Sequence, residues 1–523
     1  MSPALSSITE LVAQPMHEED LDRLAVALEG GEEWTYRELA AHAHRYAHVL
    51  QRAGVVAGDR VAMLLYNSLE YWALYLAITR LGAIAVRVNF RLAPPELDYV
   101  LSDSGAAVVC LHDDFADAVA GIRDPSGAIR YLGFPHGGET PPAWLEPFAG
   151  LDGYQETGDV DVPVPDAGAA AMIMYTSGTT GRPKGAVWTH GNSLWFAVAQ
   201  ALEWKYDRTT VAMTTGPLYH VGAFEDLLLP ALVSRGTAVI TRSGGFDIER
   251  MMTVLAERRV TDTLIYPFMI YEMLSHPRLG EFDLSALRRI TTGGSAIATW
   301  AVEAMLERLP GVDLIPTYGL TEGGGIATIM PSVQGTQRHP DSVGKPLPFT
   351  EVRVAGPTGE EVARDEVGEV WVRSPSVSRE YWGKPEASAE TFVDGWCRTG
   401  DLGRVTPDGF LVLAGRQKEM IKSGGENIYP LEVENALTLH DEIVDAAVIG
   451  VPDERFQEAV CAFVVLTPGS SLTVDDIIEH SRTRLASYKK PRHVFIVDEL
   501  PRTPSGKVTK YVLRERFDER AAL

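Results

Sequence analysis

The sequence predicts an α/β protein of several domains, in which mostly parallel sheets are covered by helices. Two observations support this class. Patterns typical of buried strands alternate with helical patterns through most of the N-terminal half, and this alternation is typical of parallel sheets covered on both faces. The chain also has 523 residues, more than a single hydrophobic core supports, so we expect two to four domains.

The first α/β units begin close to the N-terminus. Apolar residues recur at helical spacing over 34–55, and a buried strand is expected at 59–67. A helix, a turn and a strand follow over 68–86, and 97–113 repeats a helix and then a strand. The same order returns later, with a helix at 246–259, a strand at 262–267 and a strand that runs into a glycine turn at 287–294.

The C-terminal part has a different character. From about residue 342 the chain is rich in Val, Gly and Pro with short alternating runs, which indicates antiparallel strands and a small barrel. From residue 431 helices and strands alternate again. This last segment is long enough for a small separate α/β domain.

Composition excludes several classes of function. The net charge of −24 argues against non-specific binding to nucleic acid or to anionic membranes. The three cysteines form no CxxC pair, so we expect neither a zinc site nor a disulfide framework, and a reducing cytoplasm. The N-terminus has no signal-peptide pattern, so we expect no signal peptide. Polar residues interrupt the most apolar stretch, 61–88, so we do not expect it to span a membrane.

One loop carries the first chemical signal. The stretch MYTSGTTGRPKGAVWTH (174–190) lies between expected strands at 167–175 and 185–190. A Walker-type loop would open a helix, and Pro183 before Lys184 argues against one. We expect a strand-to-strand loop whose N–H groups, hydroxyls and lysine wrap phosphate oxygens. Its candidate residues are Thr176, Ser177, Gly178, Thr179, Thr180, Gly181 and Lys184.

This loop resembles the signature loop of the adenylate-forming enzymes, and further motifs of the acyl- and aryl-CoA synthetase type, similar to fatty-acid–CoA ligases, follow in the same order. Together they cover nearly the whole chain. They are PLYHVGAF (217–224), TTGGSA (291–296), YGLTE (318–322), RTGD (398–401), GRQKEMIKSGGENIYP (415–430) and PRTPSGKVTK (501–510).

The resemblance implies an organisation of the chain. It implies a large ATP- and acid-binding domain over 1–414, made of two mostly parallel α/β subdomains and a small β-barrel. A hinge over 415–420, centred on Lys418, would join it to a mobile α+β lid domain over 421–523.

The resemblance also assigns roles to residues. Tyr318 would stack on adenine, Asp401 would bind the ribose hydroxyls, and Glu322 would hold Mg²⁺. The further ATP-site residues are Gly293, Gly294, Ser295, Gly319, Thr321 and Arg416, and the catalytic residues are Lys507, Lys422, His220 and Thr321.

Elementary chemistry agrees with these roles. A carboxylate accepts two hydrogen bonds from a ribose diol, a hard oxygen ligand suits Mg²⁺, and tyrosine offers a flat face to a purine. Two positions depart from the family pattern. Pro316 stands where an amide side chain usually reads adenine, and Cys397 stands where an aromatic residue usually precedes RTGD.

The pocket for the acid is predicted to be apolar. Glycines 323–325 are expected to leave space for the acyl group, which favours a bulky or long hydrophobic acid, although Glu225 and Asp226 lie close by in sequence. The pocket candidates are Tyr219, His220, Val221, Ala223, Phe224, Tyr266, Phe268, Met269, Gly323, Gly324 and Gly325.

The implied reaction uses ATP, Mg²⁺ and coenzyme A. A carboxylate attacks the α-phosphorus to give acyl-AMP and pyrophosphate, and a thiol then displaces AMP. Transfer to a carrier-protein phosphopantetheine or to a partner enzyme is the alternative, a luciferase-type oxygenase comes third, and a phosphotransferase would release ADP instead. We expect a cytoplasmic monomer or homodimer that binds no nucleic acid.

Overall fold

The protein is described by a computed structural model. It describes residues 7–8, 17–124, 126–137, 140–148, 158–176, 182–293, 297–423, 426–453, 455–502 and 508–521.

A nine-stranded sheet forms one half of the large N-terminal part, and its centre is parallel as predicted. Antiparallel pairs close both edges. In spatial order its strands are β16 (Lys345–Pro346), β15 (Gly325–Ile329), β14 (Asp313–Leu320), β13 (Arg289–Thr292), β12 (Asp262–Leu264), β10 (Val211–Thr214), β11 (Thr237–Ile240), β1 (Leu24–Leu28) and β2 (Glu33–Thr35).

An eight-stranded sheet forms the other half, and it is parallel except where β9 pairs with β8 and β19. The signature loop therefore joins two antiparallel strands and does not open a helix, which confirms the prediction. In spatial order the strands are β19 (Glu380–Tyr381), β9 (Lys184–Thr189), β8 (Ala170–Thr176), β4 (Ile84–Arg87), β3 (Arg60–Leu64), β5 (Ala106–His112), β6 (Arg130–Phe134) and β7 (Glu146–Pro147).

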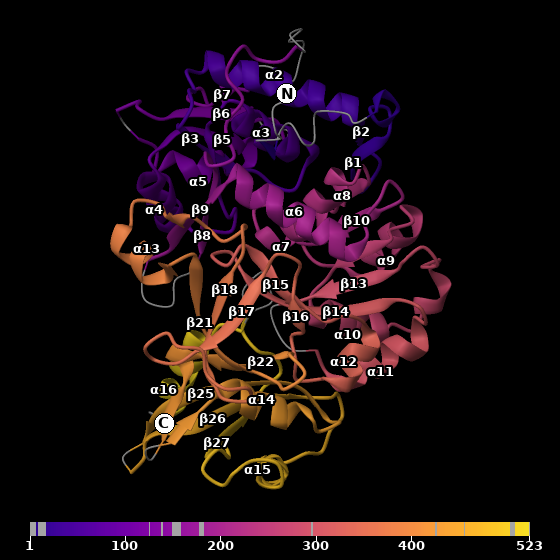
Figure 1. Cartoon of the computed structure of the whole chain (residues 1–523), viewed down its shortest axis with the longest axis vertical. Coiled ribbons are helices and arrows are strands. Elements are labelled where there is room, and N and C mark those ends of the chain that lie inside the picture. The colour runs from indigo at the N-terminus through magenta and orange to yellow at the C-terminus, as the bar shows by residue number, and fades with distance from the viewer. Residues whose placement is uncertain are drawn as a thin grey trace.

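Helices fill the space around and between these sheets (Figure 1). Every residue of α3 except Glu70 is buried, as expected of a helix that is apolar on almost all sides, and the largest core cluster includes Trp72 from α3 with Trp188 from β9 and Phe196 from α6. The helices are α2 (Tyr36–Arg52), α3 (Leu69–Arg80), α4 (Pro94–Ser104), α5 (Ala116–Ala120), α6 (His190–Trp204), α7 (Val221–Ala223), α8 (Leu229–Val233), α9 (Ile248–Glu257), α10 (Pro267–Ser275), α11 (Thr299–Arg308), α12 (Val333–Arg338) and α13 (Pro385–Thr391), with a π-helical turn η3 (Phe224–Leu228) and 3₁₀ turns η1 (Glu18–Asp20), η2 (Asp113–Phe115) and η4 (Leu279–Glu281).

An antiparallel sheet follows, which confirms the change of character predicted near residue 342. In Figure 1 it lies between the N-terminal sheets and the C-terminal part at the bottom of the view. Its strands are β17 (Glu351–Ala355), β18 (Gly368–Arg373), β21 (Trp396–Val405), β20 (Phe392–Val393) and β22 (Leu411–Arg416).

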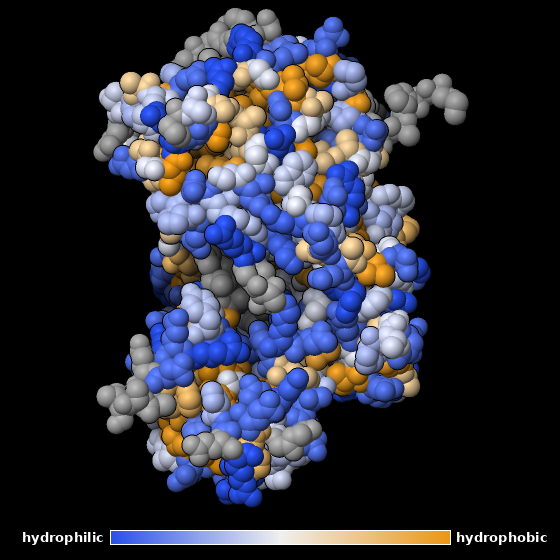
Figure 2. Space-filling view, turned by 90° about the vertical axis from the view of Figure 1, so that its left-hand side faces the viewer, coloured by the Kyte–Doolittle hydropathy of each residue, from blue (hydrophilic) through white to orange (hydrophobic). Residues whose placement is uncertain are grey.

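The chain ends in a small unit with its own sheet and core, again as predicted. The 3₁₀ turn η5 (Gln417–Glu419) leads into it. A space-filling view shows a hollow between this lower unit and the larger body above it (Figure 2). Its elements are β23 (Ile421–Ser423), β24 (Glu426–Ile428), β25 (Ile443–Asp453), β26 (Gln457–Leu466), β27 (His493–Ile496), α14 (Pro430–Thr438), α15 (Val474–Arg482) and α16 (Lys510–Ala521).

All three cysteines, Cys110, Cys397 and Cys461, are buried and free. Within the described ranges, no helix is both long and apolar enough to cross a membrane.

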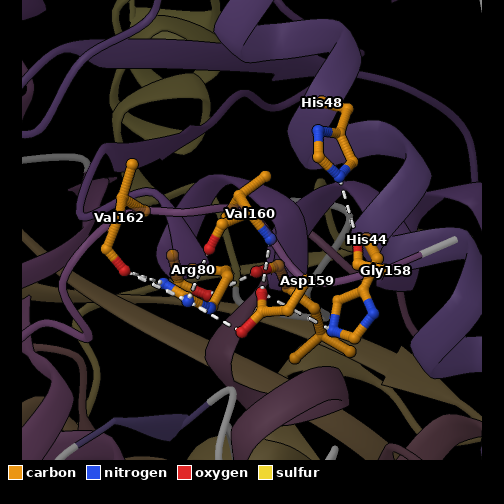
Figure 3. Close-up of polar contacts among 9 residues, drawn as sticks. His44, His48, Arg80, Gly158, Asp159, Val160 and Val162 are labelled. Atoms are coloured by element: carbon orange, nitrogen blue, oxygen red, sulfur yellow. Dashed lines mark hydrogen bonds and ion pairs between the residues drawn. The ribbon is translucent and has the colours of Figure 1, made fainter. Parts of the chain in front are cut away.

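A polar cluster fastens the segment before β8 to the helices α2 and α3 (Figure 3). The buried Arg80 donates to the carbonyls of Val160 and Val162, at 3.1 and 3.2 Å, and to Asp159 Oδ2 at 2.8 Å. His44 Nε2 lies 3.8 Å from Asp159 Oδ1, and His48 Nε2 lies 3.0 Å from a neighbouring carbonyl. Arg80 therefore supplies donors to the Val162 carbonyl and to the Asp159 carboxylate, and it adds a second donor to the Val160 carbonyl, which also accepts the Val162 N–H at 3.0 Å.

We expect Arg80→Met to lower the midpoint of thermal unfolding, because the loss of the donor to the Val162 carbonyl costs about 1–3 kcal/mol. The matched control is Arg130→Met, which removes an exposed pair with Glu146 whose side chains are 41% and 49% exposed; exposed pairs contribute at most about 1 kcal/mol. Equal losses in the two variants, measured by circular dichroism, would contradict this account.

Candidate active site

The turn between β14 and β15, residues 321–324, is the centre of the candidate site. The Trp188 indole on β9 donates to the Thr321 carbonyl at 2.9 Å. The Ser378 hydroxyl donates to the same carbonyl at 3.2 Å, and its backbone N–H donates to the Glu322 carbonyl at 3.0 Å. Both N-terminal sheets and the chain before β19 therefore position Thr321 and Glu322.

The Glu322 carboxylate contacts one end of the signature loop and a tyrosine of β19. Its Oε1 accepts hydrogen bonds from Thr176 Oγ1 at 2.8 Å and from Tyr381 Oη at 3.0 Å. Thr176 ends β8 opposite Lys184 in the antiparallel register, and Lys184 Nζ lies 5.0 Å from the centre of the Tyr381 ring. The loop residues Ser177, Gly178, Thr179, Thr180 and Gly181 lie outside the described residues.

The chemistry of this corner fits a Mg²⁺ ion. Glu322 offers carboxylate oxygens beside the Thr176 hydroxyl, and Mg²⁺ typically takes one or two carboxylates together with phosphate oxygens and water. Among the described residues, no group of three His, Cys, Asp or Glu side chains gathers as an all-protein metal cage. Glu322 is therefore suited to hold the ion only together with a phosphate ligand.

A second polar group joins β14 to the consecutive strands β21 and β22. Tyr318 Oη on β14 donates to Asp401 Oδ2 at 2.8 Å, and Arg416 Nε lies 3.1 Å from Asp401 Oδ1. Asp401 and Arg416 face each other in the register of β21 and β22. Burial and the neighbouring Asp401 raise the pKa of Tyr318 well above its usual range, so its hydroxyl remains a donor at neutral pH. The structure thus brings together Tyr318, Asp401 and Arg416, which were all predicted for the ATP site.

Two predicted glycines in this region have a packing reason. A side chain at Gly319 would overlap the backbone of Gly325, and one at Gly293 would come within 2.9 Å of Thr317 Oγ1. The other two predicted residues of this turn, Gly294 and Ser295, lie outside the described residues.

His220 begins the short helix α7, and its Nδ1 accepts the Gly222 N–H at 3.0 Å. In the neutral ring this places the proton on Nε2. Arg87 fixes the backbone around His220. Its guanidinium donates to the carbonyl of Leu218 and, at 3.4 Å, to the carbonyl of His220. Arg87 also forms an ion pair with Glu225 in which both side chains are fully buried.

A cavity of about 150 Å³ opens beside this turn. Three predicted pocket residues line it, Tyr266, Phe268 and Met269. Other residues that line the cavity were not predicted. The charged and aromatic ones are Phe90, Arg91, Arg242, Phe246, Asp247 and Arg250.

The remaining pocket predictions need correction in two places. Phe224 does not face open space: it is fully buried and stacks on Trp72 at 3.9 Å between ring centres. At the glycine turn, the positions that side chains would take are occupied as well. A side chain at Gly323 would meet Leu320, one at Gly324 would overlap Ser376, and one at Gly325 would overlap Phe196. Protein atoms already fill these volumes.

Three other predicted pocket residues, Tyr219, Val221 and Ala223, are buried in the His220 segment. The C-terminal predictions are placed in part. Lys422 is exposed on β23 and Lys418 is exposed in η5, while Lys507 lies outside the described residues.

Sequence reasoning missed Trp188, Ser378, Tyr381 and Arg87. Trp188 lies within the quoted signature stretch, and Tyr381 lies in the aromatic run REYWGKP (379–385). The spacing of residues in these two segments does not show that the Trp188 and Tyr381 side chains reach the turn at Glu322. Those contacts depend on how β9, β14 and β19 meet in the fold.

The chain was compared with known proteins. The AMP-binding enzyme family matches residues 14–382, and the AMP-binding enzyme C-terminal domain matches residues 432–507. Feruloyl-CoA synthase of Amycolatopsis sp is 40% identical over 93% of this chain and 95% of its own length. Indoleacetate–CoA ligase of Aromatoleum aromaticum is 37% identical over 92% of both chains.

The fold also matches a solved structure. The anthranilate CoA ligase AuaEII, in complex with anthranoyl-AMP, superposes with a TM-score of 0.89 at 27% identity over 99% of both chains.

We expect Glu225→Leu to destabilise the protein strongly, since it strands the buried Arg87 guanidinium at a cost of about 3–5 kcal/mol. The double variant Arg87→Met/Glu225→Leu removes both charges and should regain most of the lost thermal stability. A double variant that unfolds as early as the single one would show that the pair does not act as a unit.

Proposed function

The chain belongs to the AMP-binding enzyme family, and we propose that it is an acid–CoA ligase that activates compact aryl acids. A carboxylate oxygen attacks the α-phosphorus of ATP, the bond to the β-phosphate oxygen breaks, and acyl-AMP and pyrophosphate form. The sulfur of coenzyme A then attacks the acyl carbon, the carbon–oxygen bond breaks, and AMP leaves. The observation that carries the proposal is the meeting of Thr176, Glu322 and Tyr381 at the end of the signature loop.

The first step brings two anions together, so positioning and charge stabilisation supply most of the catalysis. Lys184 would face this step from one side, and Thr321 would face it from the hairpin turn. Mg²⁺ held by Glu322 would neutralise phosphate charge. Tyr318, Asp401 and Arg416 would orient the adenosine and thereby fix the α-phosphate in front of the acid.

The arginine-lined cavity suits coenzyme A better than the acid. Arg91, Arg242 and Arg250 lie around it, and guanidinium groups bind phosphates well. Its wall includes Pro217, whose carbonyl accepts the His220 N–H at 3.0 Å. The thiol-bearing arm of coenzyme A, if it ran along this cavity, would therefore reach the turn that carries His220. We propose that Tyr266, Phe268 and Met269 contact this arm as well as the acid.

A compact acid is favoured over a long chain because protein atoms fill the space at Gly324 and Gly325. The relatives named for ferulate and indoleacetate act on aryl acids, and anthranoyl-AMP is the adenylate bound to AuaEII. A fatty acid is the second candidate. A free α-amino acid is disfavoured because neither nearby carboxyl group offers a free negative charge: Glu225 is paired with Arg87, and burial together with Glu225 raises the pKa of Asp226 to about 8.

For the chain's organisation we propose the domain bounds 1–414 and 421–523, with rotation about the hinge 415–420 between the two steps. The protein would work in the cytoplasm as a monomer or homodimer, and a carrier-protein thiol is the alternative acceptor.

The direct test of function is a panel of acids with ATP, Mg²⁺ and coenzyme A. We expect AMP, pyrophosphate and acyl-CoA from ferulate and indoleacetate, less from dodecanoate, and little from acetate, which leaves apolar surface unfilled at about 0.8 kcal/mol per missing CH₂. Release of ADP, or acetate or phenylalanine as the best substrate by kcat/KM, would refute the proposal. Pyrophosphate without acyl-CoA from every accepted acid would favour the carrier protein.

Lys507 and Lys422 should serve different half-reactions. Loss of a preorganised charge costs about 10²–10³ in rate. We expect Lys507→Ala to slow pyrophosphate release by about that factor, while the variant still converts synthetic acyl-AMP and coenzyme A into thioester. Lys422→Ala should do the reverse, and Lys418→Pro, which stiffens the hinge, should slow only the second step. Timing each half-reaction separately decides the matter, and equal slowing of both steps by Lys507→Ala would exclude the division.

A further inference from the structure

Two acidic side chains lie in the protein interior behind His220. The π-helical turn η3 carries Glu225 and Asp226 as neighbours, and both are buried. Glu225 is fully buried against Arg87, which balances its charge. No comparable cation accompanies Asp226 among the described ion pairs, so the two carboxyl groups require separate explanations.

Asp226 lies between two parts of the candidate site. A side chain built on Gly222 would approach Asp226 Oδ2 to 3.7 Å and His220 Nδ1 to 3.2 Å. A side chain built on Gly325 would approach Asp226 Oδ1 to 2.9 Å and would overlap the Phe196 ring. The carboxyl group therefore occupies the space between the His220 turn and the glycine turn of the β14–β15 hairpin, where the acyl group was predicted to run.

The hydrogen-bonding capacity of Asp226 is not used up. The residue is 9% exposed, and its Oδ1 has no hydrogen-bond partner within the described part of the chain. A buried polar group without a partner is costly, and such groups in native proteins often serve a functional role. Burial and the neighbouring Glu225 raise the pKa of Asp226 to about 8, although a hydrogen bond from the Ile326 backbone acts in the opposite direction. At neutral pH the group is mainly a neutral acid with one O–H donor and acceptor oxygens.

The surroundings define what Asp226 can bind. The Phe196 ring and Asp226 Oδ1 both approach Gly325. Tyr266 is buried, and its pKa is raised by burial and by the neighbouring Tyr219 and Asp226. The environment of Asp226 is therefore aromatic, with one polar group in it. A small hydroxyl on an aromatic ring matches this combination, because it both donates and accepts a hydrogen bond. An alkyl end would leave Asp226 Oδ1 buried and without a partner, which is the arrangement that sites built for hydrogen bonding reject most strongly.

Building on the aryl-acid activity proposed above, we propose that Asp226 is a specificity-determining residue that hydrogen-bonds a ring hydroxyl of the acid, so that hydroxylated aryl acids are preferred over their alkyl counterparts. Glu225 does not compete for the substrate, because Arg87 holds it.

The test compares matched pairs of acids in which a 4-hydroxyl replaces a 4-methyl group. The acids are 4-hydroxycinnamate with 4-methylcinnamate, and 4-hydroxyphenylacetate with 4-methylphenylacetate. Pyrophosphate release gives kcat/KM for each acid with the wild type, Asp226→Leu, Asp226→Asn and Asp20→Asn. The last variant is the control, because Asp20 is a buried aspartate paired with Arg208 and outside the site.

We expect the wild type to prefer the hydroxylated member of at least one pair by about tenfold or more, the effect of one buried hydrogen bond. Asp226→Leu should abolish or invert this preference. Asp226→Asn, which keeps a donor and an acceptor, should retain part of it, and Asp20→Asn should retain all of it.

The outcomes separate this inference from the proposed function. Equal use of both members of each pair by the wild type overturns the role of Asp226. An unchanged preference in Asp226→Leu does so too, as does turnover of dodecanoate with none of the four aryl acids. If Asp226→Leu does not fold, the wild-type ratios and Asp226→Asn still decide. Absence of pyrophosphate release with every acid, dodecanoate included, would instead remove the proposed function itself.

Discussion

The hydrogen bond from the Trp188 indole to the Thr321 carbonyl connects the two large sheets at the point where the chemistry is expected. Trp188 belongs to the eight-stranded sheet and Thr321 follows a strand of the nine-stranded sheet. Because the Trp188 side chain is fully buried in the core they share, the two sheets cannot shift relative to each other without breaking this contact. The strand ends that carry the signature loop, on one sheet, therefore keep a fixed position relative to Glu322, which follows a strand of the other sheet.

The overall charge of the protein is strongly negative, but the charged groups near the site depend on local partners. The pair of Arg87 and Glu225 is removed from water and anchors backbone carbonyls of the His220 turn. The arginines that line the cavity beside it remain accessible to an anion. The net charge of −24 thus says little about the ligands of the site, because their binding depends on a few cations and oriented N–H groups within a short distance.

Much of the fold was predictable from the sequence because its signals are local. Alternating periodicities indicated the parallel sheets, and Pro183 before Lys184 indicated a strand-to-strand loop. The residues placed by long-range packing could not be found this way. The glycine turn illustrates the limit: missing side chains at Gly324 and Gly325 suggested open space, yet Ser376 and Phe196 approach closely enough to fill it. Phe224 similarly was read as a pocket residue, although its partner Trp72 comes from a helix far away in sequence.

The central claim is that the acid is activated as an acyl-adenylate, and oxygen transfer tests it most directly. The acid is labelled with ¹⁸O in both carboxylate oxygens and is converted in a single turnover with ATP and coenzyme A. The masses of the products are then measured by mass spectrometry. The account predicts one ¹⁸O atom in AMP, because the bond from the acyl carbon to that oxygen breaks in the second step. Label in inorganic phosphate, or unlabelled AMP alongside acyl-CoA, would contradict it.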